Sequence, residues 1–177
     1  MGIEWLRVVS FCAYLASWVA VGLGAVVGMR RKSEGEGSGA GFGWGVLLQV
    51  AAALPVTLTL GEGALRPAVW ELAGALVLAP LGAGLYWWAL RSGESGLVTG
   101  GAFALVRHPM YLGFFLLVAA TALLASARWT LAAAVVLYAL GTEMRVAREE
   151  TELGRRFGDE HARYRARTRW RWLPGLR

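Results

Sequence analysis

The sequence predicts an all-α protein, an integral membrane bundle of five transmembrane helices with a short helical tail in the cytoplasm. Of the 177 residues, 56% are hydrophobic and only 17% are charged, and the mean hydropathy is +0.48. This composition is too apolar for a soluble domain of this length. The apolar residues form long stretches without the two-residue alternation of a membrane β-strand. The basic residues lie mostly between and after these stretches.

Each apolar stretch is near the roughly 20 residues that an α-helix needs to cross the hydrocarbon layer. No cleavage site follows the first stretch, so we expect a retained helix rather than a signal peptide. All 177 residues are expected to form one membrane domain, with three transmembrane helices in residues 1–98 and a helical hairpin in residues 99–177. The expected helices cover residues 5–29, 44–60, 68–90, 109–126 and 129–146.

The distribution of basic residues predicts the orientation in the membrane. Of the 18 basic residues, all but Arg7, Arg66 and Arg128 fall on one side of the expected bundle. The positive-inside rule then places the N-terminus outside and the C-terminus in the cytoplasm, most simply in a bacterial-type cytoplasmic membrane. The arginine-rich tail would attract anionic membrane lipids, whereas the acidic residues within it argue against nucleic-acid binding. We expect a monomer or a weak homo-oligomer.

A basic turn opens the fourth expected helix. Proline is favoured at the first helical position, so His108-Pro109 predicts that His108 lies at the N-cap with its ring free to turn inward. With Arg107 beside the positive end of the helix dipole, the turn suits a carboxylate or a phosphate. Tyr111 follows in the first turn. The simpler alternative is that these residues only mark the membrane boundary.

Two glutamates continue the fifth expected helix into the cytoplasm. Only two residues separate the last two helices, so they should form an antiparallel hairpin that brings Glu149 and Glu150 to the level of His108. Glu143 shares a face with Glu150, at a depth where a charge is costly unless it is partnered or functional. Ordinary surface pairing with nearby arginines is the alternative.

Basic and acidic groups on facing walls suit a zwitterionic ligand, such as the amino-acid end of S-adenosylmethionine. Aromatic residues of the tail, if they are not interfacial anchors, could close over an adenine ring; these are Phe157, Tyr164, Trp170 and Trp172. We expect no metal site, because His108 and His161 are the only histidines and neither has a ligand-spaced cysteine or carboxylate cluster.

The motifs of the C-terminal part, taken together, resemble the isoprenylcysteine carboxyl methyltransferase family, whose general plan the phospholipid methyltransferases share. The resemblance covers about the last 45% of the chain, in the right order. One departure is His161, where relatives commonly have a tyrosine. The matching motifs are Thr99-Gly100-Gly101 with Arg107-His108-Pro109-Met110-Tyr111-Leu112-Gly113, Arg145 with Glu149-Glu150 and Leu153, Phe157-Gly158, Tyr164, and Trp172-Leu173-Pro174.

The resemblance implies a membrane methyltransferase that uses S-adenosylmethionine at the cytoplasmic side of the last two helices. His108 and Tyr111 would line the cofactor site, and Glu149 or Glu150 would hold the cofactor's ammonium group or ribose. The backbone of residues 101–106 would contact the nucleoside, and the tail would cover it. The expected cofactor-binding residues are Gly101, Leu105, Val106, Arg107, His108, Tyr111, Glu149, Glu150 and Tyr164.

The expected reaction is transfer of the sulfonium methyl group to a carboxylate, amine or thiol of a lipophilic substrate that enters from the bilayer. Arg167 or Arg169 would orient an anionic acceptor, and Glu150 or Glu143 would be the base for an amine. Two alternatives stay open at this point. One is a membrane reductase that uses NADPH, and the other is a non-catalytic membrane protein whose tail binds anionic lipid.

Overall fold

The computed structural model describes residues 2–33, 49, 67–92, 96–125 and 128–176, and the regular elements in these ranges are all helical. This confirms the all-α fold class. The expected helix at 44–60 lies outside the described residues, apart from Gln49. The elements are α1 (Gly2–Ser33), α4 (Val69–Ser92), the short 3-10 helix η1 (Gly101–Ala104), α5 (Pro109–Leu124) and α6 (Arg128–Arg167).

Two of the described helices are long and apolar enough to cross a membrane. These spans are Glu4–Gly24 within α1 and Val69–Ser92, which is the whole of α4. The apolar helix α5 is shorter, with 16 residues. The expected number of five spans and their orientation therefore stay predictions.

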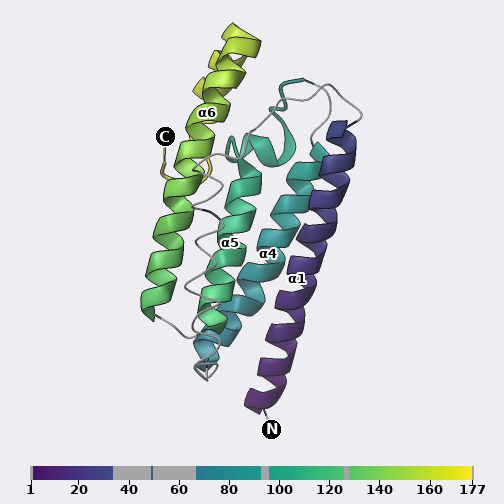
Figure 1. Ribbon diagram of the computed structural model, residues 1–177, viewed down its shortest axis with the longest axis vertical. Coiled ribbons are helices and arrows are strands. Elements are labelled where there is room, and N and C mark those ends of the chain that lie inside the picture. Colours follow the sequence, from purple (N-terminus) through teal and green to yellow (C-terminus); the bar gives the residue numbers. More distant parts are fainter. Residues whose placement is uncertain (1, 34–48, 50–66, 93–95, 126–127, 177) are drawn as a thin grey trace.

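The helices α1, α4, α5 and α6 lie side by side along their lengths (Figure 1). Two hydrogen bonds show that α1 and α4 are parallel. Near the start of both helices, the Ser10 hydroxyl donates to the Leu72 carbonyl at 3.2 Å. Further along both helices, the Trp87 indole donates to the Ala20 carbonyl at 2.9 Å. The five-helix prediction requires this parallel direction, because it places one further membrane-spanning helix between these two in the sequence.

Helices α4 and α5 are antiparallel and meet through small residues. A Cβ atom built on Gly82 would lie 2.6 Å from the Gly113 carbonyl oxygen, so the two backbones are in direct contact. Close approach through small residues is a common way for membrane helices to pack. The buried core here comprises Val21, Leu72, Ala75, Ala79, Ala83, Tyr86, Leu117, Ala120 and Leu124.

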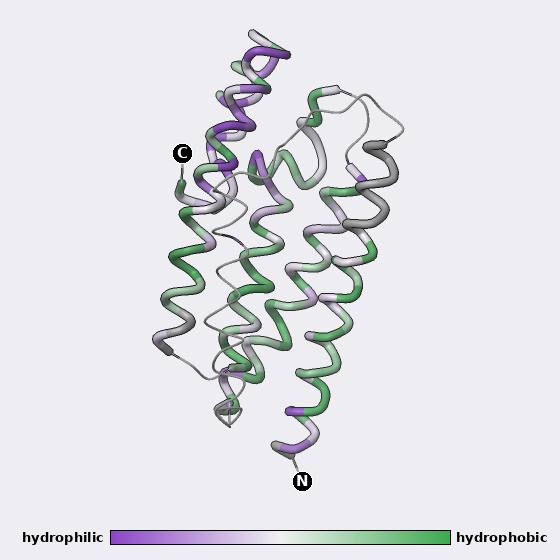
Figure 2. The backbone as a smooth tube through the Cα atoms, in the orientation of Figure 1, coloured by the Kyte–Doolittle hydropathy of each residue, from purple (hydrophilic) through white to green (hydrophobic). Residues whose placement is uncertain are grey.

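Helices α5 and α6 form the expected antiparallel hairpin. Ala125 packs near Ala134 at one end of the hairpin, and Tyr111 meets Glu149 at the other. Beyond the hairpin, α6 continues through its hydrophilic part to Arg167, so the expected helical tail is an extension of the same helix (Figure 2). Its helical backbone is broken at Gly158, whose φ of 46° lies in the left-handed region that favours glycine.

The C-terminal segment after α6 folds back onto the start of α5. The backbone N–H of His108 donates to the Arg171 carbonyl at 2.8 Å. Trp172 is only 1% exposed, and its ring makes edge contacts with Phe115 and Tyr138. Trp172 is therefore a core residue, and the expectation that it covers an adenine ring was wrong, because the helical hairpin already buries it.

Candidate active site

The turn before α5 has the predicted form. Pro109 is the first helical residue and His108 is the N-cap, with φ −129° and ψ 66°. The His108 side chain makes no capping hydrogen bond, so its ring is available to turn toward α6. Arg107 and His108 are both buried, which excludes the alternative that they only mark a solvated membrane boundary.

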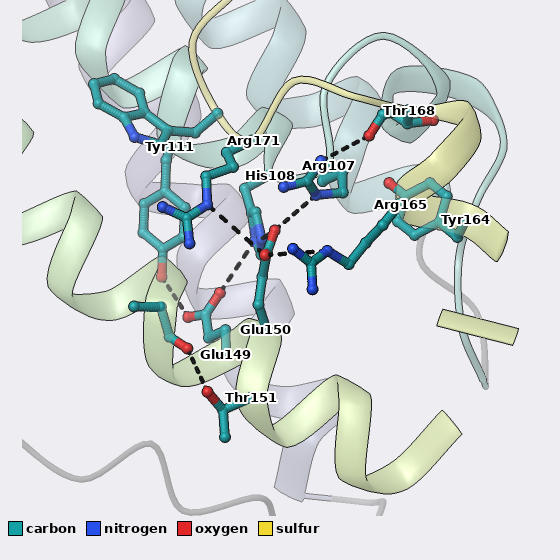
Figure 3. Close-up of polar contacts among 12 residues, drawn as sticks. Arg107, His108, Tyr111, Glu149, Glu150, Thr151, Tyr164, Arg165, Thr168 and Arg171 are labelled. Carbon is teal, nitrogen blue, oxygen red and sulfur yellow. Dashed lines mark hydrogen bonds and ion pairs between the residues drawn. The ribbon is translucent and has the colours of Figure 1, made fainter. Parts of the chain in front are cut away.

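Arg107 joins three segments through its guanidinium group. Its Nε donates to Glu150 Oε1 at 2.7 Å, in an ion pair whose side chains are only 4% and 6% exposed. Its Nη1 donates to the carbonyl oxygens of Thr168 and Arg169, at 2.8 Å each. A buried charge needs a partner and hydrogen bonds, and Arg107 has both. The basic turn, α6 and the C-terminal segment are thereby tied together (Figure 3).

His108 lies between the two glutamates. Its Nδ1 is 3.4 Å from Glu149 Oε2, and its Nε2 is 3.4 Å from Glu150 Oε1. These contacts are ion pairs when His108 is protonated, and the buried Nε2 makes no hydrogen bond to any described residue. The Tyr111 hydroxyl donates to Glu149 Oε1 (Figure 3). The Arg145 guanidinium lies over the Tyr111 ring, 5.2 Å from its centroid. The two predicted walls of the site do meet.

These contacts set the ionisation of the cluster. Burial alone would raise the pKa of Glu150, but its contacts with His108 and Arg107 outweigh this effect and lower the pKa to about 2. Burial would also raise the pKa of Glu149, and contacts with His108 and Tyr111 lower it instead. Burial would lower the pKa of His108, yet the two glutamates together raise it. Both carboxylates are therefore ionised at neutral pH beside a histidine that is readily protonated.

Two arginines that the sequence did not single out lie near Glu150. Arg165 Nε and Arg171 Nε are each 3.7 Å from Glu150 Oε2 (Figure 3). Arg167 and Arg169, which were predicted instead, have exposed side chains without a polar contact to any described residue. The spacing of the tail arginines does not indicate which of them face Glu150. The break in α6 at Gly158 decides this, because it sets the direction of the helix that follows.

The remaining predicted residues line the segment from η1 to the turn. Gly101 has a positive φ of 59°, and a Cβ there would lie 2.6 Å from the Ser92 hydroxyl. Leu105 is exposed, whereas Val106 is buried. The buried Tyr164 hydroxyl donates to the Phe103 carbonyl at 2.8 Å, which holds the second part of α6 against η1. Burial raises the pKa of this hydroxyl.

Glu143 fastens the C-terminal segment. Its Oε2 accepts a hydrogen bond from Arg171 at 2.8 Å, and its Oε1 accepts one from the Trp172 indole at 2.7 Å. The charge is thus partnered, as its depth requires. With both oxygens engaged, this carboxylate is less available as a base than Glu149.

Within the described ranges, no group of three or more His, Cys, Asp or Glu side chains is arranged to hold a metal ion. The acidic and basic groups are instead paired with one another. The arrangement is suited to binding a ligand that carries both charges.

One comparison with known proteins bears on the site. Residues 70–155 match the model of the isoprenylcysteine carboxyl methyltransferase (ICMT) family. This range contains α4 from its second residue, η1, α5, the basic turn and both glutamates, and it ends before Tyr164 and Arg171. No curated protein matches the chain. The match confirms the resemblance found in the motifs and supports a methyltransferase of membranes that acts on a lipophilic substrate.

Proposed function

We propose that the protein transfers a methyl group from S-adenosylmethionine to a nucleophile of a lipophilic substrate. The observation that carries the proposal is the buried cluster of Arg107 and His108 with Glu149 and Glu150, inside the range that matches the methyltransferase family. A cluster of facing charges at the junction of two apolar helices is costly unless it is paired or functional.

The charges present fit the amino-acid end of this cofactor. Its ammonium and sulfonium groups need anionic partners, and its carboxylate needs cationic ones. Glu150 is already committed to Arg107, whereas the Glu149 side chain is 37% exposed and held in place by Tyr111. Glu149 is therefore the better partner for the ammonium group. The Nε2 of His108, which makes no hydrogen bond to a described residue, and the guanidinium of Arg171 would serve the carboxylate.

When bound, the cofactor supplies a methyl group on a positively charged sulfur. The residues of the chain would contribute orientation and removal of water, which give most of the acceleration in a direct transfer. Arg145 lies beside Tyr111 and Glu149, on the side of the cluster toward the apolar hairpin. It is a better placed cation than Arg167 or Arg169 for orienting an anionic acceptor that arrives from the bilayer.

Calorimetry with S-adenosylhomocysteine on the protein in detergent tests the proposal. The wild type should bind it, and Glu149→Gln should bind it at least tenfold more weakly, since a charged hydrogen bond would be lost. Glu152→Gln is the matched control, because Glu152 is exposed on the same helix. If the protein bound NADPH but not S-adenosylhomocysteine, the membrane reductase would be favoured instead. If it bound neither compound, the non-catalytic lipid-binding protein would be the remaining alternative.

The acceptor can be identified by chemistry. Labelled methyl groups should move from S-adenosylmethionine into a total membrane extract when the protein is added. If the acceptor is a carboxylate, mild base should release the label as methanol, whereas a methylated amine or thiol would retain it. Absence of transfer into any lipid-soluble fraction would contradict the proposed substrate class.

The proposed orientation, with the cluster on the cytoplasmic side, can be tested by labelling. In a Cys12→Ser background, Arg155→Cys adds one exposed thiol to the hydrophilic part of α6. A membrane-impermeant maleimide should label this thiol in inverted vesicles and not in intact cells. The opposite pattern would reverse the topology.

A further inference from the structure

The part of α6 beyond Gly158 presents one buried face to the rest of the protein. Between Asp159 and Thr168, the buried residues are His161, Tyr164 and Thr168, which are spaced as on one side of a helix. Two of the three are fully engaged. The Tyr164 hydroxyl donates to the Phe103 carbonyl, and the Thr168 carbonyl accepts from Arg107.

His161 is the exception on this face. It is only 3% exposed, and among the described residues its buried Nε2 has no hydrogen-bond partner. Burial lowers the pKa of His161, so its ring is neutral at physiological pH. A Cβ atom built on Gly154, one helical turn after Glu150, would lie 3.7 Å from the His161 Nδ1, so the ring faces the part of α6 that carries Glu150. The charges that act on its pKa are those of Glu150, Arg165, Arg107 and His108. A neutral imidazole offers one donor and one acceptor.

We propose that His161 contacts the bound methyl donor and that its Nε2 forms a hydrogen bond with the uncharged nucleoside part. This inference rests on the proposed function. An unsatisfied polar atom in a buried position costs folding free energy. A ligand that forms a hydrogen bond with the Nε2 would account for such an atom at this position. The charged end of the ligand already has partners in Glu149 and His108.

The nucleoside is the favoured partner because of the position and charge of the ring. His161 precedes Tyr164 by one helical turn, and Tyr164 is bonded to η1, away from the half-buried carboxylate of Glu149 (Figure 3). Burial, Arg165 and Arg107 together outweigh the effect of Glu150, so a positive charge on His161 is disfavoured. A ring that stays neutral suits the hydroxyl and amine groups of a nucleoside.

The variant His161→Phe separates this role from a purely structural one. It removes the hydrogen-bonding atoms and keeps an aromatic ring. We expect affinity for S-adenosylhomocysteine to fall about three- to tenfold, as for one neutral hydrogen bond, while the melting temperature of the ligand-free protein stays level or rises. His161→Leu is a second variant, made in case the phenyl ring of His161→Phe does not fit. It should show the same loss of affinity. Glu160→Gln, at the exposed neighbouring position, is the control for both measurements.

The part of the ligand that His161 contacts is tested with 5′-methylthioadenosine, which lacks the amino-acid end. His161→Phe should weaken binding of this compound by the same factor as binding of S-adenosylhomocysteine. Glu149→Gln should weaken only S-adenosylhomocysteine. Unchanged affinity of the His161 variants for both compounds, or a loss confined to S-adenosylhomocysteine, would overturn the inference. Failure of the wild type to bind either compound would instead overturn the proposed function.

Discussion

The two interfaces of α5 are built on different physical principles. Toward α4, the contact is between backbones at Gly82 and Gly113 and is surrounded by small apolar side chains. Toward α6, the helices are joined at one end by the ion pairs of Arg107 and His108 with two glutamates. The first interface consists of closely packed backbone and apolar side chains, whereas the second brings together charges that a polar ligand can use.

This difference shows how a small membrane protein separates support from chemistry. Close packing of small residues gives a rigid pair of helices without polar groups that would be costly in lipid. The charged interface sits at the end of the hairpin, where α6 becomes hydrophilic (Figure 2). Disturbing each interface in turn should therefore give distinct effects on stability and on ligand binding.

The largest effect is expected for Glu150→Ala. This variant leaves the guanidinium of Arg107 buried without its anion, which typically costs about 3–5 kcal/mol of unfolding free energy. The double variant Arg107→Met with Glu150→Leu should recover most of this loss without recovering ligand binding. Unfolding by denaturant in detergent and calorimetry measure the two properties. Equal stability of the single and double variants would show that the pair is not coupled.

The same pair predicts a dependence on pH. The pKa of the Glu150 carboxylate is lowered from its usual 4.5 to about 2, so its stabilising contribution is complete above pH 4.5 and is lost as the pH falls toward 2. At roughly 1.4 kcal/mol per pKa unit, the loss is about 3 kcal/mol. Melting temperatures between pH 2 and pH 6 should show a steeper decline for the wild type than for Glu150→Gln. Parallel curves would contradict the assignment.

A smaller loss is expected at the apolar interface from Gly82→Ala. The added Cβ would lie 2.6 Å from the Gly113 carbonyl oxygen, and backbone cannot rotate away as a side chain can. Overpacking of this kind costs about 1–3 kcal/mol. Gly84→Ala is the matched control, since nothing lies within 4 Å of its Cβ. If both variants had the same melting temperature, the helices would not be in backbone contact.

The last prediction concerns Trp172→Phe, which keeps an aromatic ring in the hairpin and removes the indole hydrogen bond to Glu143. Arg171 remains bonded to the same carboxylate, so the lost hydrogen bond should cost about 1 kcal/mol, and the smaller ring adds a packing loss at this buried position. The change at the exposed Trp170 serves as the control, because Trp170→Phe removes no buried contact. A melting temperature that differed no more than that of the control would argue against the role of Glu143 in fastening the C-terminal segment.

Much of the site could be predicted because local rules determine it. Proline at the first helical position fixes the His108 turn, and the short connection before α6 forces the hairpin that brings Glu149 and Glu150 to it. The break in α6 and the partners of the tail arginines could not be predicted. They depend on one left-handed glycine, Gly158, and on a C-terminal segment that folds back over the turn.

The sequence alone determined that the chain is helical, apolar and suited to a membrane, and that its polar chemistry lies between Arg107 and the C-terminal segment. Periodicity, proline placement and charge distribution are local properties, so they can be read without a structure. Only the tertiary structure decided that Glu150 neutralises Arg107, that Glu143 holds Trp172, and that Arg165 and Arg171 face the cluster. Long, flexible side chains choose among many possible partners, and three-dimensional packing selects the ones within reach.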